Sequence, residues 1–89
     1  MKTRILKFTA DWCSKCIAMS PMFRELEKDF PTIEFKEIDV ESDEGVDLSC
    51  EYTVRNVPTI LVVKDGEVVE RISGTRTKDE LKNIIEKWK

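Results

Sequence analysis

The sequence predicts a single α/β domain spanning residues 1–89, with elements in the order βαβαββα and a mixed sheet covered by helices on both faces. Two observations predict this fold. First, short β-branched or apolar runs alternate along the chain with stretches of helical periodicity. Second, 89 residues of which 40% are apolar and 37% charged can enclose one modest core but not two.

The first half of the chain predicts a strand, a helix and a second strand. Residues 4–9 are almost continuously apolar apart from Lys7, which suits a buried parallel strand. A helix is expected over residues 13–29, with apolar residues at helical spacing and Pro21 as an interior kink. Residues 33–40 predict a second strand, and the helical crossover implies a right-handed parallel pairing with the first.

The next segment predicts a short helix and a hairpin. The acidic residues 41–44 are expected to open a helix ending near Tyr52, since negative charge stabilises a helix N-terminus. Residues 59–63 are strongly β-branched and predict a third strand. The dipeptide Asp65-Gly66 then predicts a tight turn into an antiparallel fourth strand at residues 67–73.

The C-terminal segment predicts a last helix. Thr77 followed three residues later by Glu80 is the pattern of a capping box, which places the start of a helix at this point. The apolar residues that follow recur on one helical face, and we expect the last of them, Trp88, to lie in or near the core.

The composition excludes several classes of function. The formal net charge is −3 and no basic stripe with interleaved aromatic residues is present, so we do not expect nucleic-acid binding. Charged residues interrupt the apolar positions of residues 1–7, which is unlike a signal peptide or a transmembrane span. We therefore expect a cytoplasmic protein with no membrane role, in a reducing compartment where paired thiols are catalytic more often than structural.

The motif Cys13-Ser14-Lys15-Cys16 carries the predicted chemistry. Spacing of i, i+3 puts both sulfurs on one helical turn and within disulfide reach, with Cys13 at a helix N-terminus that favours a thiolate. This arrangement indicates thiol-disulfide exchange. The alternative is half of a zinc site, but the chain has no histidine and only one further cysteine, Cys50, so we expect no metal.

Several motifs, taken together, resemble the thioredoxin family. The segments that match its active-site turn, helix proline, cis-proline loop, hairpin and final glycine are residues 8–16, Pro21, residues 55–59, residues 64–67 and Gly74. The resemblance implies a sheet in the order 2-1-3-4 and a protein-disulfide reductase that acts as an electron carrier in cell redox homeostasis. It also implies a monomer with no bound cofactor, and as partners disulfide-bearing substrate proteins and a flavin- or ferredoxin-dependent thioredoxin reductase.

The resemblance also assigns roles to individual residues. Cys13 is expected to be the exposed nucleophile and Cys16 the buried resolving thiol, the two forming the redox-active disulfide. Substrate-binding roles are implied for the four residues Trp12, Val57, Pro58 and Gly74. A cis bond at Pro58 would leave the backbone of Val57 free to pair with an extended substrate segment, and the alternative is a trans proline that opens an edge strand. For Trp12 two roles remain open, packing support for the core and contact with the substrate.

The chain departs from the family pattern in its first elements and in its motif. The usual first strand and helix before the active-site strand are absent, so we expect a short, minimal version of the fold. Ser14-Lys15 replaces the common Gly-Pro between the cysteines. We expect Lys15 to lower the pKa of Cys13 and raise the reduction potential, unless its side chain simply points into solvent, where screening makes a charge ineffective.

The third departure is Lys7, where family members usually carry a buried aspartate thought to assist proton transfer at the second cysteine. Strand alternation puts Lys7 on the same face as Glu37 of the next strand, where many relatives place a lysine. We expect the two to form a charge-swapped pair that tunes the site. The alternative is that the Lys7 ammonium reaches the surface along its apolar stem.

Two other functions remain open at this stage. One is a glutathione-dependent, glutaredoxin-like reductase, although the double glycine and acidic pair of that family are missing after Pro58. The other is a protein-interaction module of thioredoxin shape without essential redox activity. Cys50 is expected to point away from the helix face that carries Leu48 and Tyr52, as a bystander thiol, and regulatory oxidation is its alternative.

Overall fold

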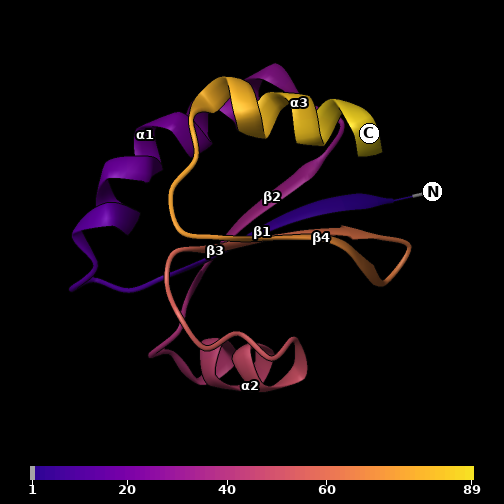
Figure 1. Cartoon of the computed structure of the whole chain (residues 1–89). Helices are drawn as coiled ribbons and strands as arrows, with labels where there is room; N and C mark the ends of the chain where they lie inside the picture. The colour runs from indigo at the N-terminus through magenta and orange to yellow at the C-terminus, as the bar shows by residue number, and fades with distance from the viewer. Residues whose placement is uncertain (1) are drawn as a thin grey trace.

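The structure is a computed structural model and describes residues 2–89. It contains the predicted seven elements in the predicted order. They are β1 (Thr3–Thr9), α1 (Ser14–Asp29), β2 (Glu34–Asp39), α2 (Asp43–Glu51), β3 (Thr59–Lys64), β4 (Glu67–Ser73) and α3 (Lys78–Trp88). Helices α1 and α3 cover one face of the sheet and α2 covers the other (Figure 1).

The four strands lie in the order β2-β1-β3-β4, which confirms the predicted sheet. Strand β1 pairs in parallel with β2 and antiparallel with β3, and β3 pairs antiparallel with β4. In this register Lys7 lies between Glu37 on β2 and Ile60 on β3. β1 is an inner strand of the sheet, and its residues from Ile5 to Phe8 are buried.

Strand alternation divides the apolar side chains between the two faces of the sheet. On one face Ile5 packs with residues of α1 and α3, among them Phe23, Leu26 and Ile85. On the other face the buried cluster consists of Leu6, Phe8, Ile38, Leu61 and Val63, with Leu48 and Tyr52 of the α2 region packed against it. Trp88 packs at the edge of the first cluster, as predicted.

Capping side chains decide where the helices begin. Cys13 is the N-cap of α1, so the helix starts one residue later than predicted, and Pro21 lies inside it. Ser42 caps α2 by accepting a hydrogen bond from the Gly45 N–H at 2.9 Å. The helix therefore begins at Asp43, within the acidic stretch 41–44 and not at its first residue. The predicted capping box of Thr77 and Glu80 is present at the start of α3.

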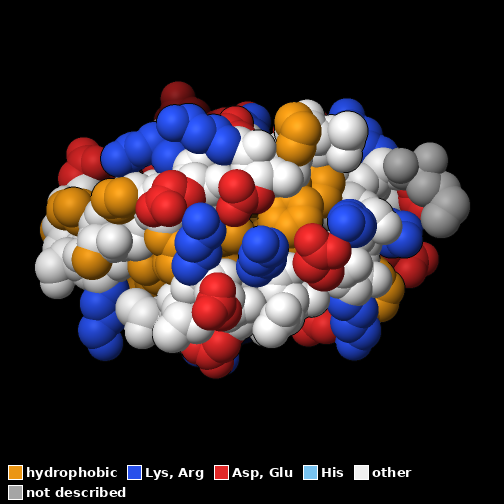
Figure 2. All heavy atoms as spheres, turned by 90° about the horizontal axis from the view of Figure 1, so that it is seen from above, with side chains coloured by type: hydrophobic (Ala, Val, Ile, Leu, Met, Phe, Trp, Pro, Cys, Tyr) orange, Lys and Arg blue, Asp and Glu red, His pale blue; other side chains and the backbone are white. Residues whose placement is uncertain are grey.

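The face formed by α1 and α3 carries charges of both signs. Lys and Arg side chains are interspersed there with Asp and Glu side chains, and apolar atoms show between them (Figure 2). Lys78 links the two helices through ion pairs with Glu25 at 3.2 Å and Asp29 at 3.4 Å. Among residues 2–89, none of the helices combines the length and the apolar character needed to cross a bilayer.

Candidate active site

A disulfide joins Cys13 and Cys16 at the point where β1 turns into α1. Because Cys13 is the N-cap and Cys16 lies in the first turn, their Cα atoms are 5.2 Å apart. The Cys13 sulfur also accepts a hydrogen bond from the Cys16 N–H at 3.2 Å. The sulfur of Cys13 is therefore held by the helix N-terminus, whose partial positive charge suits an anion.

The two cysteines differ in their access to solvent. Cys16 is fully buried, as expected, whereas Cys13 keeps 8% of its surface exposed. The expectation of an exposed Cys13 is thus wrong for the disulfide state. Ala10, Val40 and Val57 pack around the cysteine pair and cover most of its surface. Cys13 remains the only one of the two with a route to solvent.

The loop before β3 supplies the wall beside the disulfide. The Val57-Pro58 peptide bond is cis, so the trans alternative is wrong. Gly74, at a positive φ of 83°, donates its N–H to the carbonyl oxygen of Pro58 at 2.9 Å. This bond holds the end of β4 against the loop, and three of the four expected substrate-binding residues, Val57, Pro58 and Gly74, therefore lie together.

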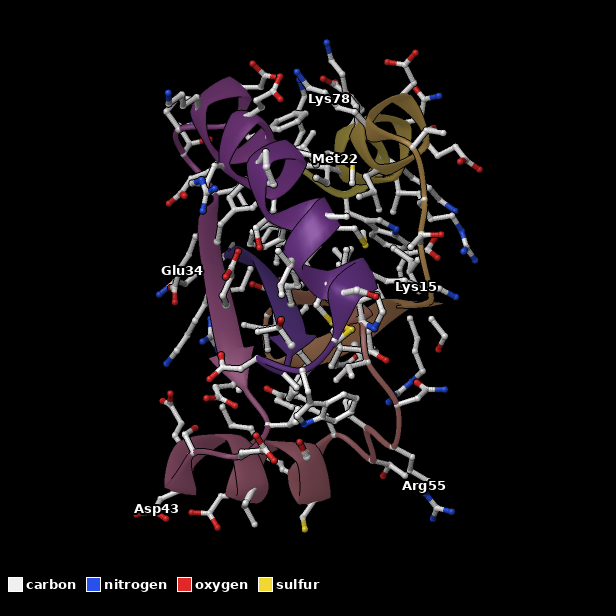
Figure 3. All side chains as sticks on the ribbon, turned by 90° about the vertical axis from the view of Figure 1, so that its left-hand side faces the viewer. Lys15, Met22, Glu34, Asp43, Arg55 and Lys78 are labelled. Carbon is white, nitrogen blue, oxygen red and sulfur yellow. A yellow bond between two sulfur atoms is a disulfide. The ribbon has the colours of Figure 1, made fainter. Side chains whose placement is uncertain are left out.

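A groove of about 320 Å³ runs next to this loop. Its wall is mainly apolar and includes Trp12, Val40, Val46, Cys50, Val54 and Val57. Trp12 is 68% exposed, so it covers little of the core and offers its ring to the groove. The loop that carries Arg55 and the first turn of α1, marked by Lys15, face the viewer at the same end of the molecule (Figure 3).

Lys7 is fully buried beneath the active-site turn, which rules out the alternative that its ammonium reaches the surface. Its Nζ donates to the carbonyl oxygen of Cys16 at 2.9 Å and to the Ser20 hydroxyl at 3.1 Å. The expected ion pair is present, with Glu37 Oε1 at 3.7 Å from Nζ. Burial lowers the pKa of Lys7 below its ordinary value, and the Glu37 carboxylate opposes that shift.

Comparison with known proteins identifies the family of this chain. The sequence model of the Thioredoxin family matches residues 1–87. The chain belongs to the thioredoxin family. It is 42% identical to a thioredoxin H-type of Fagopyrum esculentum over 94% of this chain and 70% of that protein. A thioredoxin H-type of Oryza sativa subsp. indica is 41% identical over 97% of this chain and 68% of its own length.

Solved thioredoxins share this fold over most of their length. The X-ray structure of Fasciola hepatica thioredoxin superimposes with a TM-score of 0.88 at 32% identity, covering 99% of this chain and 82% of that one. A thioredoxin of Nicotiana alata gives a TM-score of 0.87 at 37% identity, covering 97% and 72% of the two chains. The protein is therefore a thiol-disulfide oxidoreductase of the protein-disulfide reductase type, with Cys13–Cys16 as its redox-active disulfide and no need of a cofactor.

Two residues near the thioredoxin site were not predicted from the sequence. Ser20 lies four residues after Cys16 on α1, and its hydroxyl donates to the Cys16 carbonyl oxygen, the atom that also accepts from Lys7. The spacing of four residues along a helix could have indicated this contact. Cys50 is an exposed free thiol, as expected, but it also lines the groove beside Trp12. No local pattern could reveal that placement, because α2 and the active-site turn are distant in sequence. Within residues 2–89 no group of three metal-ligating side chains gathers.

Proposed function

We propose that this thioredoxin reduces disulfides of folded or partly folded proteins through Cys13-Ser14-Lys15-Cys16. The observation that carries the proposal is the unequal burial of the pair, since Cys13 alone has access to solvent beside an apolar groove. The Cys13 thiolate attacks a substrate disulfide and forms a mixed disulfide. Cys16 then attacks Cys13, and the substrate leaves as a dithiol.

The substrate segment is expected to bind in an extended form across the cis-proline loop. Trp12 and Val57 supply apolar contact at the groove, and the Val57 backbone supplies hydrogen bonds of the β-augmentation type. The Gly74 N–H donates a hydrogen bond to the Pro58 carbonyl oxygen and so holds the end of β4 against the cis-proline loop. The open, mainly apolar wall suits a protein segment better than a small charged ligand.

Each turnover leaves the Cys13–Cys16 disulfide, so a reductant must restore the dithiol. We propose a thioredoxin reductase, flavin- or ferredoxin-dependent, acting on a monomer in the cytoplasm. An exposed free thiol such as Cys50 persists most readily in that reducing compartment. Lys15 is exposed on the first turn of α1, and we propose that its ammonium favours the Cys13 thiolate, with an effect reduced by solvent screening.

The test is reduction of insulin disulfides with dithiothreitol as the terminal electron donor. We expect the parent protein to accelerate the reaction and Cys13→Ser to abolish the acceleration. Cys50→Ser is the matched control, since it removes a thiol from the same groove and should keep the parent rate. An interaction module would instead give equal rates for all three proteins, and a glutaredoxin-like enzyme would turn over only with glutathione as the donor.

A further inference from the structure

A buried ammonium next to the redox disulfide is unusual, because a charged lysine loses its hydration when it is enclosed. Lys7 is enclosed by β1, β2, β3 and α1 and has no exposed surface. Three acceptors surround its Nζ: the Cys16 carbonyl oxygen, the Ser20 hydroxyl and the Glu37 carboxylate. Nζ donates hydrogen bonds to the first two and lies at ion-pair distance, 3.7 Å, from the Glu37 carboxylate, whose negative charge favours the charged form of the lysine.

The charge lies close to the resolving sulfur. Nζ is 2.9 Å from the carbonyl oxygen of Cys16, and the sulfur belongs to the same residue. The ammonium and the sulfur are therefore closer than about 8 to 10 Å, the distance over which salt screens exposed charges. The Phe23 ring, with its centroid 5.7 Å from Nζ, and Ile60 exclude water from this side. The interaction therefore takes place in a medium of low polarity, where a charge is more effective than in water.

We propose that the buried Lys7–Glu37 pair is a positioning device that sets the ionisation of Cys16 and hence the rate at which the mixed disulfide is resolved. The inference rests on the dithiol chemistry proposed above. Lys7 does not touch the substrate. It stabilises the negative charge that develops on the Cys16 sulfur, and Glu37 holds the ammonium in place while reducing its field.

The step it controls is the second half of the exchange. The Cys16 thiol loses its proton to solvent, and the thiolate attacks the Cys13 sulfur of the mixed disulfide. The bond between Cys13 and the substrate sulfur breaks, and that sulfur leaves as a thiolate which takes up a proton. The protein dithiol is oxidised by two electrons and the substrate disulfide is reduced by two.

Three further features bear on the charge balance around Lys7. From α1, the Arg24 guanidinium lowers the pKa of Lys7, as burial does. From β2, the Glu37 carboxylate raises the pKa of Lys7, and its side chain is 38% exposed. On β3 the register partner Ile60 brings no charge. Removing Lys7 or Glu37 should therefore shift the ionisation of Cys16 in opposite directions.

The experiment follows the reaction of the reduced protein with 5,5′-dithiobis(2-nitrobenzoate) by stopped flow, in a Cys50→Ser background. Attack by Cys13 releases one chromophoric thiolate in a phase that depends on reagent concentration, and attack by Cys16 releases a second in a concentration-independent phase. The apparent pKa of the second phase is measured between pH 5 and pH 10. Variants are Lys7→Met, Lys7→Arg and Glu37→Gln, and Ile5→Val is the control, a mild core change two residues along β1.

We expect Lys7→Met to slow the second phase about tenfold at pH 7, since an opposite charge at this range shifts a pKa by one unit or more. Glu37→Gln should accelerate it about threefold, and Lys7→Arg should return the pKa toward the parent value. The first phase should stay within twofold throughout, and Ile5→Val should match the parent. Glu37→Gln carries the test alone if Lys7→Met does not fold.

Shifts of Lys7→Met and Glu37→Gln in the same direction, or no shift in either, would overturn the inference and leave the proposed function intact. Absence of a second phase in the parent would instead overturn the proposed function itself. A shift of equal size in Ile5→Val would assign the effect to loosened packing and would also count against the inference.

Discussion

The two faces of β1 meet very different surroundings. Toward α2 the strand presents Leu6 and Phe8, both fully buried in a cluster of apolar side chains. Toward α1 it presents Ile5 and then Lys7, which is equally buried but charged and hydrogen-bonded. The face toward α2 therefore contributes apolar packing alone. The face toward α1 replaces part of that apolar packing with a charge beneath the disulfide.

The largest stability loss is expected on the apolar face. Leu6→Ala removes a side chain with almost no exposed surface and leaves a cavity, so the free energy of unfolding should fall by about 3 kcal/mol. The rate of the Cys16 phase should stay within twofold, because no charge changes. Urea unfolding measures the first quantity and stopped flow the second. A strong effect on resolution would mean that the two faces are not separable.

The second-largest loss of stability is expected where α2 packs against the sheet. A Cβ at Gly45 would overlap the main-chain carbonyl group of Asp39, so Gly45→Ala must push the helix away from β2. We expect a loss of about 2 kcal/mol, in the range of overpacked sites. Asp47→Ala, on the exposed side of the same helix, is the control and should change stability little. Equal stability of both variants would show that α2 shifts freely.

On the face of β1 that carries Lys7, loss of Glu37 and loss of Lys7 should lower stability by different amounts. Glu37→Leu leaves a buried ammonium without its counter-charge and should lower the free energy of unfolding by about 1 to 2 kcal/mol, below the cost of breaking a fully buried pair. Lys7→Met leaves only a carboxylate that water reaches and should cost less. The double variant should recover most of the loss. Strictly additive effects in urea unfolding would argue against coupling.

The same pair predicts a pH dependence. The pKa of Lys7 is lower in the folded protein than in the unfolded chain, so between these two values the unfolded state binds more protons. The contribution of Lys7 to stability is therefore unfavourable below the folded pKa and is relieved as pH rises through that window. Stability of the parent relative to Lys7→Met should increase in alkaline solution. A constant difference from pH 7 to pH 10.5 would contradict the burial of the charge.

The smallest effect is expected at the start of α3, far from the disulfide. Thr77→Ala removes the hydroxyl that accepts the Glu80 N–H at 3.2 Å and should cost about 1 kcal/mol. Contact with the Thr77 backbone lowers the pKa of Glu80, so its share of the capping box is present above the ordinary value and is lost as pH falls through the lowered one. Thermal melts at pH 7 and pH 3 measure both. Because Thr77→Ala keeps the main-chain N–H that Glu80 contacts, both proteins should lose the Glu80 share at pH 3 and the difference between them should persist.

Local patterns in the sequence determined the elements and much of the site. Periodicity and turn residues predicted all seven elements, and β4 has the predicted bounds because its turn and its β-branched run are both local signals. The cysteine spacing predicted the disulfide. Alternation along two neighbouring strands, together with the resemblance to the thioredoxin family, also predicted that Lys7 and Glu37 face each other, and the parallel register of β1 and β2 confirms it.

Tertiary structure alone decided how these residues are covered. Val40 and Val57, distant in sequence from the motif, pack on Cys13 and remove most of the exposure that its place at a helix start suggests. The same packing brings Cys50 to the groove beside Trp12. The packing of α1 on the sheet encloses the Lys7 ammonium between them. Burial depends on which elements meet across the fold, and local periodicity records only the face that each residue occupies.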